Sequence, residues 1–183
     1  MSRDHRSDRG RQRPAAVAVA ATLALAAATF EASAQSAGPC DAGRTSDGAR
    51  VVLTCAAGLT IEIERSARYG VVDSDGDGRP EGMRLDGGAA LVDAEQGAYD
   101  NFQILTPTAI ASVRGTEWIT DAATATTSVF VRSGAVNVVA RGSNAGVVLR
   151  RGEGTDVPPN AAELRAIRWG QGRIDALLAR FGR

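Results

Sequence analysis

The one place in this sequence where a ligand can be argued from chemistry is a group of four nearby carboxylates, which could bind a calcium ion. They are spaced like the ligands at positions one, three, five and nine of a calcium loop: Asp73, Asp75, Asp77 and Glu81. Gly78 stands at position six, where such a loop turns around the ion. Position twelve is Arg84 instead of a bidentate glutamate, and Pro80 interrupts the loop. The sequence therefore predicts either a weak calcium site of the extracellular kind, to which Asp86 could add a ligand, or a solvated hairpin turn.

Groups for covalent catalysis are scarce elsewhere in the sequence. All 21 basic residues are arginine, and the single histidine is His5. Without lysine there is no Schiff-base amine, and without a further histidine there is no imidazole base and no histidine-bound zinc site. Two carboxylates about 5 to 10 Å apart could cleave a glycosidic bond, but no spacing singles out a pair. We therefore predict that the protein is not an enzyme.

The overall charge argues against a nucleic-acid partner. Beyond residue 34 the chain has 16 arginines and 18 acidic residues, so no net positive field attracts a polyanion. Arginine suits bidentate contacts with carboxylates or phosphates, although a GC-rich genome produces the same preference without functional meaning. We predict protein partners and no nucleic acid.

The first 34 residues have the pattern of an export signal. Five arginines precede an uncharged apolar run at 15–30, and Ala32, Ser33 and Ala34 form a small-x-small cleavage site. The run is shorter than the roughly 20 residues of a membrane span. We predict a signal peptide at 1–34 that is cleaved near Ala34, no transmembrane span in the mature chain, and a periplasmic or secreted protein. An uncleaved anchor is the alternative.

The predicted export makes a disulfide between the two cysteines plausible. Cys40 and Cys55 both lie beyond the predicted signal, and an oxidising compartment would let them pair. Closing a loop of about 15 residues stabilises a fold by roughly 3 kcal/mol in the chain-entropy model. Two unpaired thiols or a lipid-modified cysteine are the alternatives, but Gly38 and Pro39 do not form a lipobox. We predict a Cys40–Cys55 disulfide.

Short alternating segments predict an all-β domain over residues 35–157. Residues 51–55 and 59–64 form a hairpin in which Leu59, Ile61 and Ile63 face inward. A turn is predicted at Asp86-Gly87-Gly88. Further strands are predicted at 69–72, 83–85, 89–92, 128–131, 135–140 and 147–149. Short strands with glycine-rich turns every 8 to 12 residues indicate an antiparallel sandwich, a barrel or a short β-solenoid.

Residues 102–118 are the centre of this pattern. Two strands meet at Pro107, which lacks the backbone donor of a central ladder and therefore marks an edge, a corner or a bulge. Gly115 permits a positive φ where the second strand ends, and Trp118 begins another apolar face.

The last segment, residues 158–183, is predicted to be a helical cap. Pro158 and Pro159 end the sheet, and helical spacing begins at Ala161. Gly170 and Gly172 weaken the middle of this segment, so two short helices are an alternative. We expect the amphipathic helix and Trp169 to cover an open sheet edge. Docking on an anionic membrane or on a partner remains open.

The chain resembles the FecR-like periplasmic domain, most closely in the second half of the matching stretch. The features that carry the resemblance follow one another in the family's order: Thr106-Pro107, Arg114-Gly115-Thr116-Glu117-Trp118, the paired strands within 129–138, and the closing Gly152-Glu153. The resemblance covers about residues 48–156. In FecR-like regulators such a domain meets the signalling domain of an outer-membrane transporter, and a cytoplasmic domain captures a sigma factor. Here only about 13 residues precede the apolar run, so the resemblance implies a stand-alone periplasmic domain without the iron-uptake role.

Two hypotheses follow for the function. The first is a non-enzymatic exported module for protein interaction or envelope signalling, whose strand edges bind an envelope or outer-membrane protein. Its candidate interaction residues are those of the family motif: Thr106, Pro107, Arg114, Gly115, Thr116, Glu117 and Trp118. The alternative is a calcium- or glycan-binding β module that uses the carboxylate loop. For Arg114, a structural role as a brace at the bulge is the competing interpretation.

Overall fold

A computed structural model describes residues 38–183, except residues 96, 98, 100, 114 and 124. The predicted signal at 1–34 lies outside this part. The strands and helices are β1 (Cys40–Arg44), β2 (Arg50–Cys55), the 3-10 turn η1 (Ala56–Gly58), β3 (Leu59–Glu64), β4 (Arg68–Val72), β5 (Gly82–Ala94), β6 (Phe102–Leu105), β7 (Ala109–Val113), β8 (Glu117–Ala122), β9 (Thr127–Ser133), β10 (Ala135–Ala140), β11 (Gly146–Arg150), β12 (Glu153–Val157), β13 (Ile167–Arg168) and α1 (Gln171–Ala179). The described residues contain no helix with the length and apolar character needed to cross a membrane.

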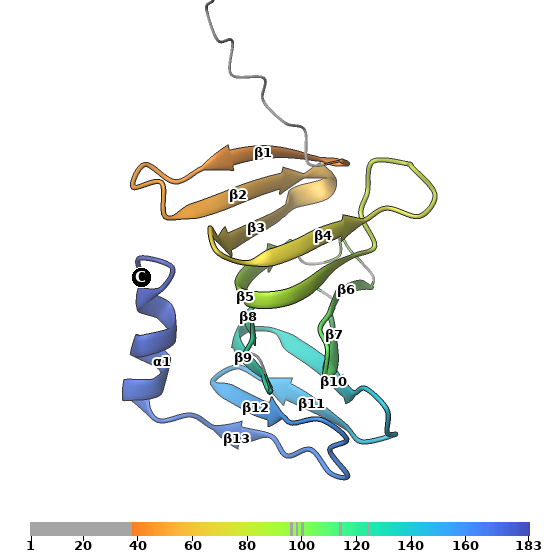
Figure 1. The fold of residues 1–183 in the computed structure, drawn as a ribbon, viewed down its shortest axis with the longest axis vertical. Helices are drawn as coiled ribbons and strands as arrows, with labels where there is room; N and C mark the ends of the chain where they lie inside the picture. The colour runs from red at the N-terminus through yellow and green to blue at the C-terminus, as the bar shows by residue number, and fades with distance from the viewer. Residues whose placement is uncertain (1–37, 96, 98, 100, 114, 124) are drawn as a thin grey trace, which may run out of the picture. The chain divides into compact units, whose positions relative to one another are not determined.

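The strands form one curled sheet with two halves that share β5 (Figure 1). Sheet A runs β1-β2-β3-β5-β8-β9-β12-β13, and sheet B runs β4-β5-β6-β7-β10-β11. The inward side chains of both halves, including Leu53 and Trp118 from sheet A and Ile104 and Val138 from sheet B, pack into one core. The predicted all-β fold with a helix near the end is therefore confirmed, and the curled sheet has the form of a half-barrel.

The first hairpin forms as the alternation predicted. Strands β2 and β3 pair around η1, and Leu59, Ile61 and Ile63 have no exposed surface. Burying each of these side chains contributes about 1.5–3 kcal/mol. Cys40 and Cys55 lie directly opposite each other on β1 and β2 and form a disulfide, as predicted.

The predicted turn at Asp86-Gly87-Gly88 does not exist, because β5 continues through it. Its first part pairs with β4 in sheet B, and the part from Gly88 onward pairs with β3 and β8 in sheet A. Gly88 has a φ of +83°, and a Cβ there would lie 2.7 Å from that of Ala67, so only glycine fits this bend. The two glycines thus carry one strand from one sheet into the other.

Two further details of strand pairing differ from the expectation. Strands β5 and β6 pair in parallel, with Met83 opposite Ile104, whereas the other strand pairs of the described part are antiparallel. Strand β12, which follows the closing Gly152, was not predicted and pairs with β9. Its sequence, Glu-Gly-Thr-Asp-Val, has few residues that favour strands, so pairing rather than propensity defines it.

The last segment is less helical than its spacing predicted. Residues 161–166 are irregular, and Ala161 and Leu164 are buried in the main core. Helix α1 begins at Gln171, after Gly170, and covers the outer face of sheet A rather than an edge (Figure 1). Ala89, Leu91, Ile119 and Phe130 of that face pack against Trp169 and α1. Strong packing of 161–164 against the core explains why this part does not follow its helical spacing.

Candidate functional site

The carboxylate loop, residues 73–81, connects β4 to β5, and its acidic side chains form hydrogen bonds to the backbone of the same loop. Asp73 accepts hydrogen bonds from the N–H groups of Gly76 and Gly78, at 3.1 and 3.2 Å. Glu81 accepts from the N–H of Ser74 through both carboxylate oxygens, at 3.1 and 2.9 Å. These bonds fold the loop back on itself, and Asp and Gly are residues that favour tight turns of this kind.

Three of the four predicted calcium ligands come together in this loop. Carboxylate oxygens of Asp73, Asp75 and Glu81 lie within 4.8 Å of one another. Asp77 stands apart from this cluster, and its carboxylate accepts the N–H of Arg79 at 2.7 Å. Asp86, the further ligand considered, pairs with Arg84 at 3.0 Å. Carboxylate oxygens are the ligands that Ca²⁺ prefers, so the cluster is chemically suited to this ion.

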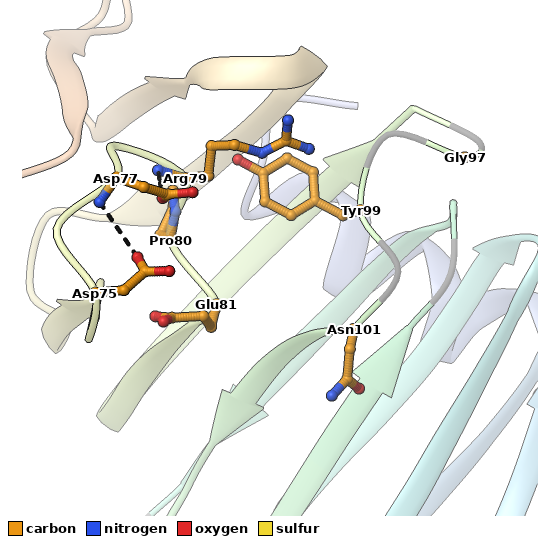
Figure 2. A pocket seen from close by; sticks show the side chains of 8 residues that line it. All are labelled: Asp75, Asp77, Arg79, Pro80, Glu81, Gly97, Tyr99 and Asn101. Atoms are coloured by element: carbon orange, nitrogen blue, oxygen red, sulfur yellow. Dashed lines mark hydrogen bonds between the residues drawn. The ribbon is translucent and has the colours of Figure 1, made fainter.

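Beside the loop lies an open hollow of about 370 Å³, shown in Figure 2. Its far side is formed by Tyr99, whose hydroxyl donates to the carbonyl of Ala56 at 2.9 Å. The guanidinium of Arg79 lies over the Tyr99 ring, 5.7 Å from its centroid. Burial raises the pKa of the Tyr99 hydroxyl above its ordinary value. The hollow thus presents carboxylates on one side and a cation over an aromatic ring on the other.

The Thr-Pro motif forms a buried corner between sheets. The hydroxyls of Thr106 and Thr108 each lie 2.7 Å from the hydroxyl of Thr127 on β9. The Thr106 hydroxyl also exchanges hydrogen bonds with the backbone of Ala109, at 2.9 and 3.0 Å. Pro107 is exposed at the tip of this corner, as a residue without a backbone donor can be. The corner therefore fixes the turn from β6 to β7 against sheet A.

The residues from Gly115 to Trp118 form a second structural junction. Thr116 is buried and donates its hydroxyl to the carbonyl of Ala135 at 3.1 Å. Glu117 is half-buried and forms an ion pair with Arg132 on β9. Trp118 has no exposed surface and lies in the core. Arg114, for which a brace at the bulge was the competing prediction, lies outside the described residues.

The burial of the motif limits what a partner could touch. Thr106, Thr116 and Trp118 are enclosed by the fold, so they position strands and offer no contact surface. Pro107, Gly115 and Glu117 are the motif residues of the described part with exposed or partly exposed surface. A partner surface must therefore be sought mainly elsewhere.

Open strand edges are the feature that the sequence did not locate. The edge strands are β1 and β13 in sheet A, and β4 and β11 in sheet B. In the described residues, the large hydrophobic side chains with the most exposure all lie on such strands: Val72 on β4 (37%), Val148 on β11 (51%) and Ile167 on β13 (57%). Exposed apolar side chains next to unpaired backbone groups are typical of sheet edges that accept another strand.

The backbone of β11 is directed outward at alternate residues. In an antiparallel pair, residues that direct N–H and C=O to the partner strand alternate with residues that direct both away. Ala140 donates to Ala145 at 2.8 Å, so in the same register Val147 and Leu149 face β10, while Gly146 and Val148 face away. The N–H of Arg150 also points outward and donates to Glu153 at 2.8 Å. Among the described residues, none bonds to the outward groups of Val148.

Comparison with known proteins gives a family match. The model of the family described as FecR protein matches residues 41–137. Two crystal structures of a candidate anti-sigma factor from Parabacteroides distasonis ATCC 8503 are similar to this chain, with TM-scores of 0.46 and 0.48 and sequence identities of 19% and 20%. Each comparison covers 77% of this chain and 61% of the other, so the chain spans about three-fifths of that protein. No curated protein matches the chain.

Proposed function

Because the chain belongs to the FecR protein family, we propose that it is a non-enzymatic interaction and signalling module of the cell envelope. It binds an envelope or outer-membrane protein by accepting a strand at the edge of β11. The observation that carries this proposal is the pair of outward backbone groups on Val148, beside a side chain that is half exposed. An added strand would satisfy these groups and cover the side chain.

The other edges are less suited to this role. Strand β13 has two residues and can support little pairing. Strand β1 carries Asp41 and Arg44, and charged side chains at an edge discourage pairing with another chain. Strand β4 begins with Arg68 and leads into the acidic loop, so its flanks are charged as well. Strand β11 ends in Arg150, but its preceding residues Gly146, Val147, Val148 and Leu149 carry no charge.

The disulfide supports the cellular location in this proposal. Disulfides persist in oxidising compartments and are rare in the cytosol, and Cys40 and Cys55 are both engaged in one. This agrees with the export signal that the sequence predicts. Within the envelope the module would act through its surfaces, since it lacks the lysine and histidine chemistry of most enzyme sites.

A proline substitution tests the strand edge. Val148→Pro removes the outward N–H and puts a ring where a partner strand would lie, while the bonds of Val147 and Leu149 to β10 remain. Val148→Thr is the matched control, because it keeps the N–H and a β-branched side chain. Each tagged mature protein is used to capture partners from an envelope extract, and thermal unfolding checks the fold.

We expect the wild type and Val148→Thr to retain one envelope protein in a stoichiometric amount. Val148→Pro should lose it with an unfolding midpoint within a few degrees of the wild type. Equal retention by a folded Val148→Pro protein would contradict strand addition at β11.

The convergence of Asp73, Asp75 and Glu81 favours a second candidate function, the binding of calcium. Such a site would be weak, in the millimolar range of extracellular modules, because Arg84 stands where a bidentate glutamate would complete the shell. Calorimetric titration of the mature protein with CaCl₂ tests this, with Asp73→Asn expected to abolish the heat. Asp86→Asn is the control, because Asp86 pairs with Arg84 outside the cluster. No binding heat at millimolar calcium would remove this function.

A further inference from the structure

Helix α1 and the preceding Trp169 lie on an apolar patch in the outer face of sheet A. We call residues 169–183 the arm, and we call the sheet surface beneath it the docking face. The apolar part of the docking face consists of Ala89, Leu91, Ile119 and Phe130. Leu177 and Phe181 of the arm are 8% and 2% exposed against it. Trp169 stacks on Phe130, with ring centroids 5.2 Å apart, and its ring covers the backbone of Gly154.

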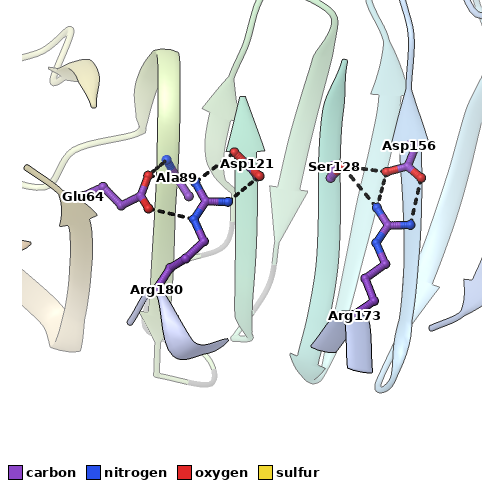
Figure 3. Close-up of polar contacts among 7 residues, drawn as sticks. All are labelled: Glu64, Ala89, Asp121, Ser128, Asp156, Arg173 and Arg180. Carbon is purple, nitrogen blue, oxygen red and sulfur yellow. Dashed lines mark hydrogen bonds and ion pairs between the residues drawn. The ribbon is translucent and has the colours of Figure 1, made fainter. Parts of the chain in front are cut away.

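Carboxylates of the docking face bind one arginine of the arm from two sides, as Figure 3 shows. Arg180 donates to both oxygens of Glu64, at 2.7 and 2.8 Å, and to both oxygens of Asp121, at 2.5 and 3.3 Å. Glu64 also accepts the N–H of Ala89 at 2.9 Å. The hydrogen bond from Arg180 lowers the pKa of Glu64 and outweighs its partial burial. We call Arg180 with these two carboxylates the arginine clamp.

Two more arginines extend this pattern along the arm. Arg173 donates to both oxygens of Asp156, at 2.5 and 3.0 Å (Figure 3). Its guanidinium also lies 3.4 Å from the centroid of the Trp169 ring. Arg183 donates to Glu62 at 2.7 Å. Four carboxylates of the docking face therefore surround its apolar part, and each pairs with an arginine of the arm: Glu62, Glu64, Asp121 and Asp156.

The arm has little helical stability of its own. Helix α1 has nine residues, whereas isolated helices shorter than about 12–15 residues are marginal in water. Its N-cap, Gly170, provides no side-chain hydrogen bond, and Gly172 lies in its first turn. Gly170 has no neighbouring atom where a Cβ would stand, so the connection to the arm is not tightly packed. The helix thus forms because the docking face binds it.

From this geometry we propose that the docking face is a binding site for arginine-bearing amphipathic helices, and that the arm is its resident occupant. The partner is a protein helix with two arginines about seven residues apart, like Arg173 and Arg180, beside an apolar stripe. Its binding displaces the arm, because both require the same carboxylates and the same apolar patch. Charge complementarity selects this partner, since an acidic or neutral helix would leave Glu64 and Asp121 unpaired.

This site is separate from the strand edge proposed above. The docking face is the outer surface of sheet A, whereas β11 is an edge of sheet B. Either site can therefore fail its test without affecting the other.

A labelled peptide of residues 167–183 tests the site on the full mature chain. In the wild type the tethered arm competes with the peptide, because a short tether gives an effective concentration in the millimolar range. Leu177→Asp weakens the arm and leaves the docking face unchanged. Fluorescence anisotropy should then show that this variant binds the peptide about 10- to 100-fold more tightly than the wild type.

Substitutions in the docking face provide the decisive control. Adding Glu64→Gln and Asp121→Asn to Leu177→Asp should weaken peptide binding at least about tenfold, because the clamp carboxylates lose their charge. A peptide with alanine in place of Arg180 should lose affinity for Leu177→Asp to a similar degree. Arg180→Ala in the full chain is a milder way to release the arm, should Leu177→Asp not fold.

Three results would overturn the proposal. The first is a folded, arm-released variant that does not bind the peptide. The second is peptide binding that the carboxylate substitutions leave unchanged. The third is that neither Leu177→Asp nor Arg180→Ala folds, which would make the arm an indispensable part of the core.

Discussion

Removing the arginine clamp should cost more stability than removing any exposed ion pair of this protein. Arg180→Ala deletes a side chain that is 34% exposed and leaves two carboxylates that are 20% and 23% exposed without their partner. Hydrogen bonds to charged groups contribute about 1.5–3 kcal/mol each, and partial exposure reduces this. We therefore expect a loss of about 2–3 kcal/mol for the four bonds together. For a unit of this size that corresponds to a fall in Tm of roughly 4 to 12 °C.

Arg165→Ala is the matched control for this measurement. Arg165 also pairs with a carboxylate, Glu163, at 2.9 Å, but the two side chains are 74% and 67% exposed. Solvent screening leaves such exposed pairs with little effect on stability. Thermal unfolding followed by circular dichroism should show a large shift for Arg180→Ala and nearly none for Arg165→Ala. If both variants unfold at the same temperature, the clamp does not stabilise the arm and our reasoning about the docking face is wrong.

Three further predictions concern pH, a close backbone contact and the disulfide. Arg180 lowers the pKa of Glu64, so the stabilisation from this carboxylate should be complete above the ordinary glutamate pKa of about 4.3 and lost as the pH falls through the lowered pKa. The difference in Tm between wild type and Arg180→Ala should therefore shrink between pH 5 and pH 2. Gly134→Ala puts a Cβ 2.7 Å from the Thr116 hydroxyl at a φ of +77°, and urea unfolding should show a loss of stability of about 2–4 kcal/mol. Gly142→Ala has a similar φ of +80° but no contact under 3.4 Å, so it should lose about 1–2 kcal/mol. Equal losses in the two variants would refute the clash at Gly134. Reducing the Cys40–Cys55 disulfide should lower the free energy of unfolding by about 3 kcal/mol, and an unchanged urea midpoint would contradict this.

The parts of the fold that local pattern determines could be predicted from the sequence. Alternation at Leu59, Ile61 and Ile63 was enough for the first hairpin, because the side-chain period of a strand decides which face is buried. The spacing of Asp73, Asp75 and Glu81 was enough to bring their oxygens together, because all three lie within one short loop.

The parts that depend on pairing could not be predicted in this way. Gly87 and Gly88 permit either a bend within one strand or a turn that reverses the chain direction, and the pairing with neighbouring strands decides which of the two forms. The edge position of β11 likewise follows from the order of strands in the sheet, which local spacing does not contain.

A signal for the docking face was nevertheless present in the sequence. Ala89, Ala90, Leu91 and Val92 are all apolar, although a strand with one solvated face would alternate. Consecutive buried residues of this kind indicate a strand covered on both sides, and the arm is the cover of the outer side. The presence of a helix near the end of the chain was therefore predicted correctly, but its predicted position at a sheet edge was wrong, because it covers the outer face of sheet A.

The course of β5 through both sheets limits how this protein can be divided. Its 13 residues belong to sheet B at one end and to sheet A at the other, so neither half of the sheet retains all of its strands when the chain is split on either side of β5. Fragments designed to isolate sheet A or sheet B would each lack a central strand or carry half of it unpaired. The smallest unit worth producing for binding studies is consequently the complete curled sheet.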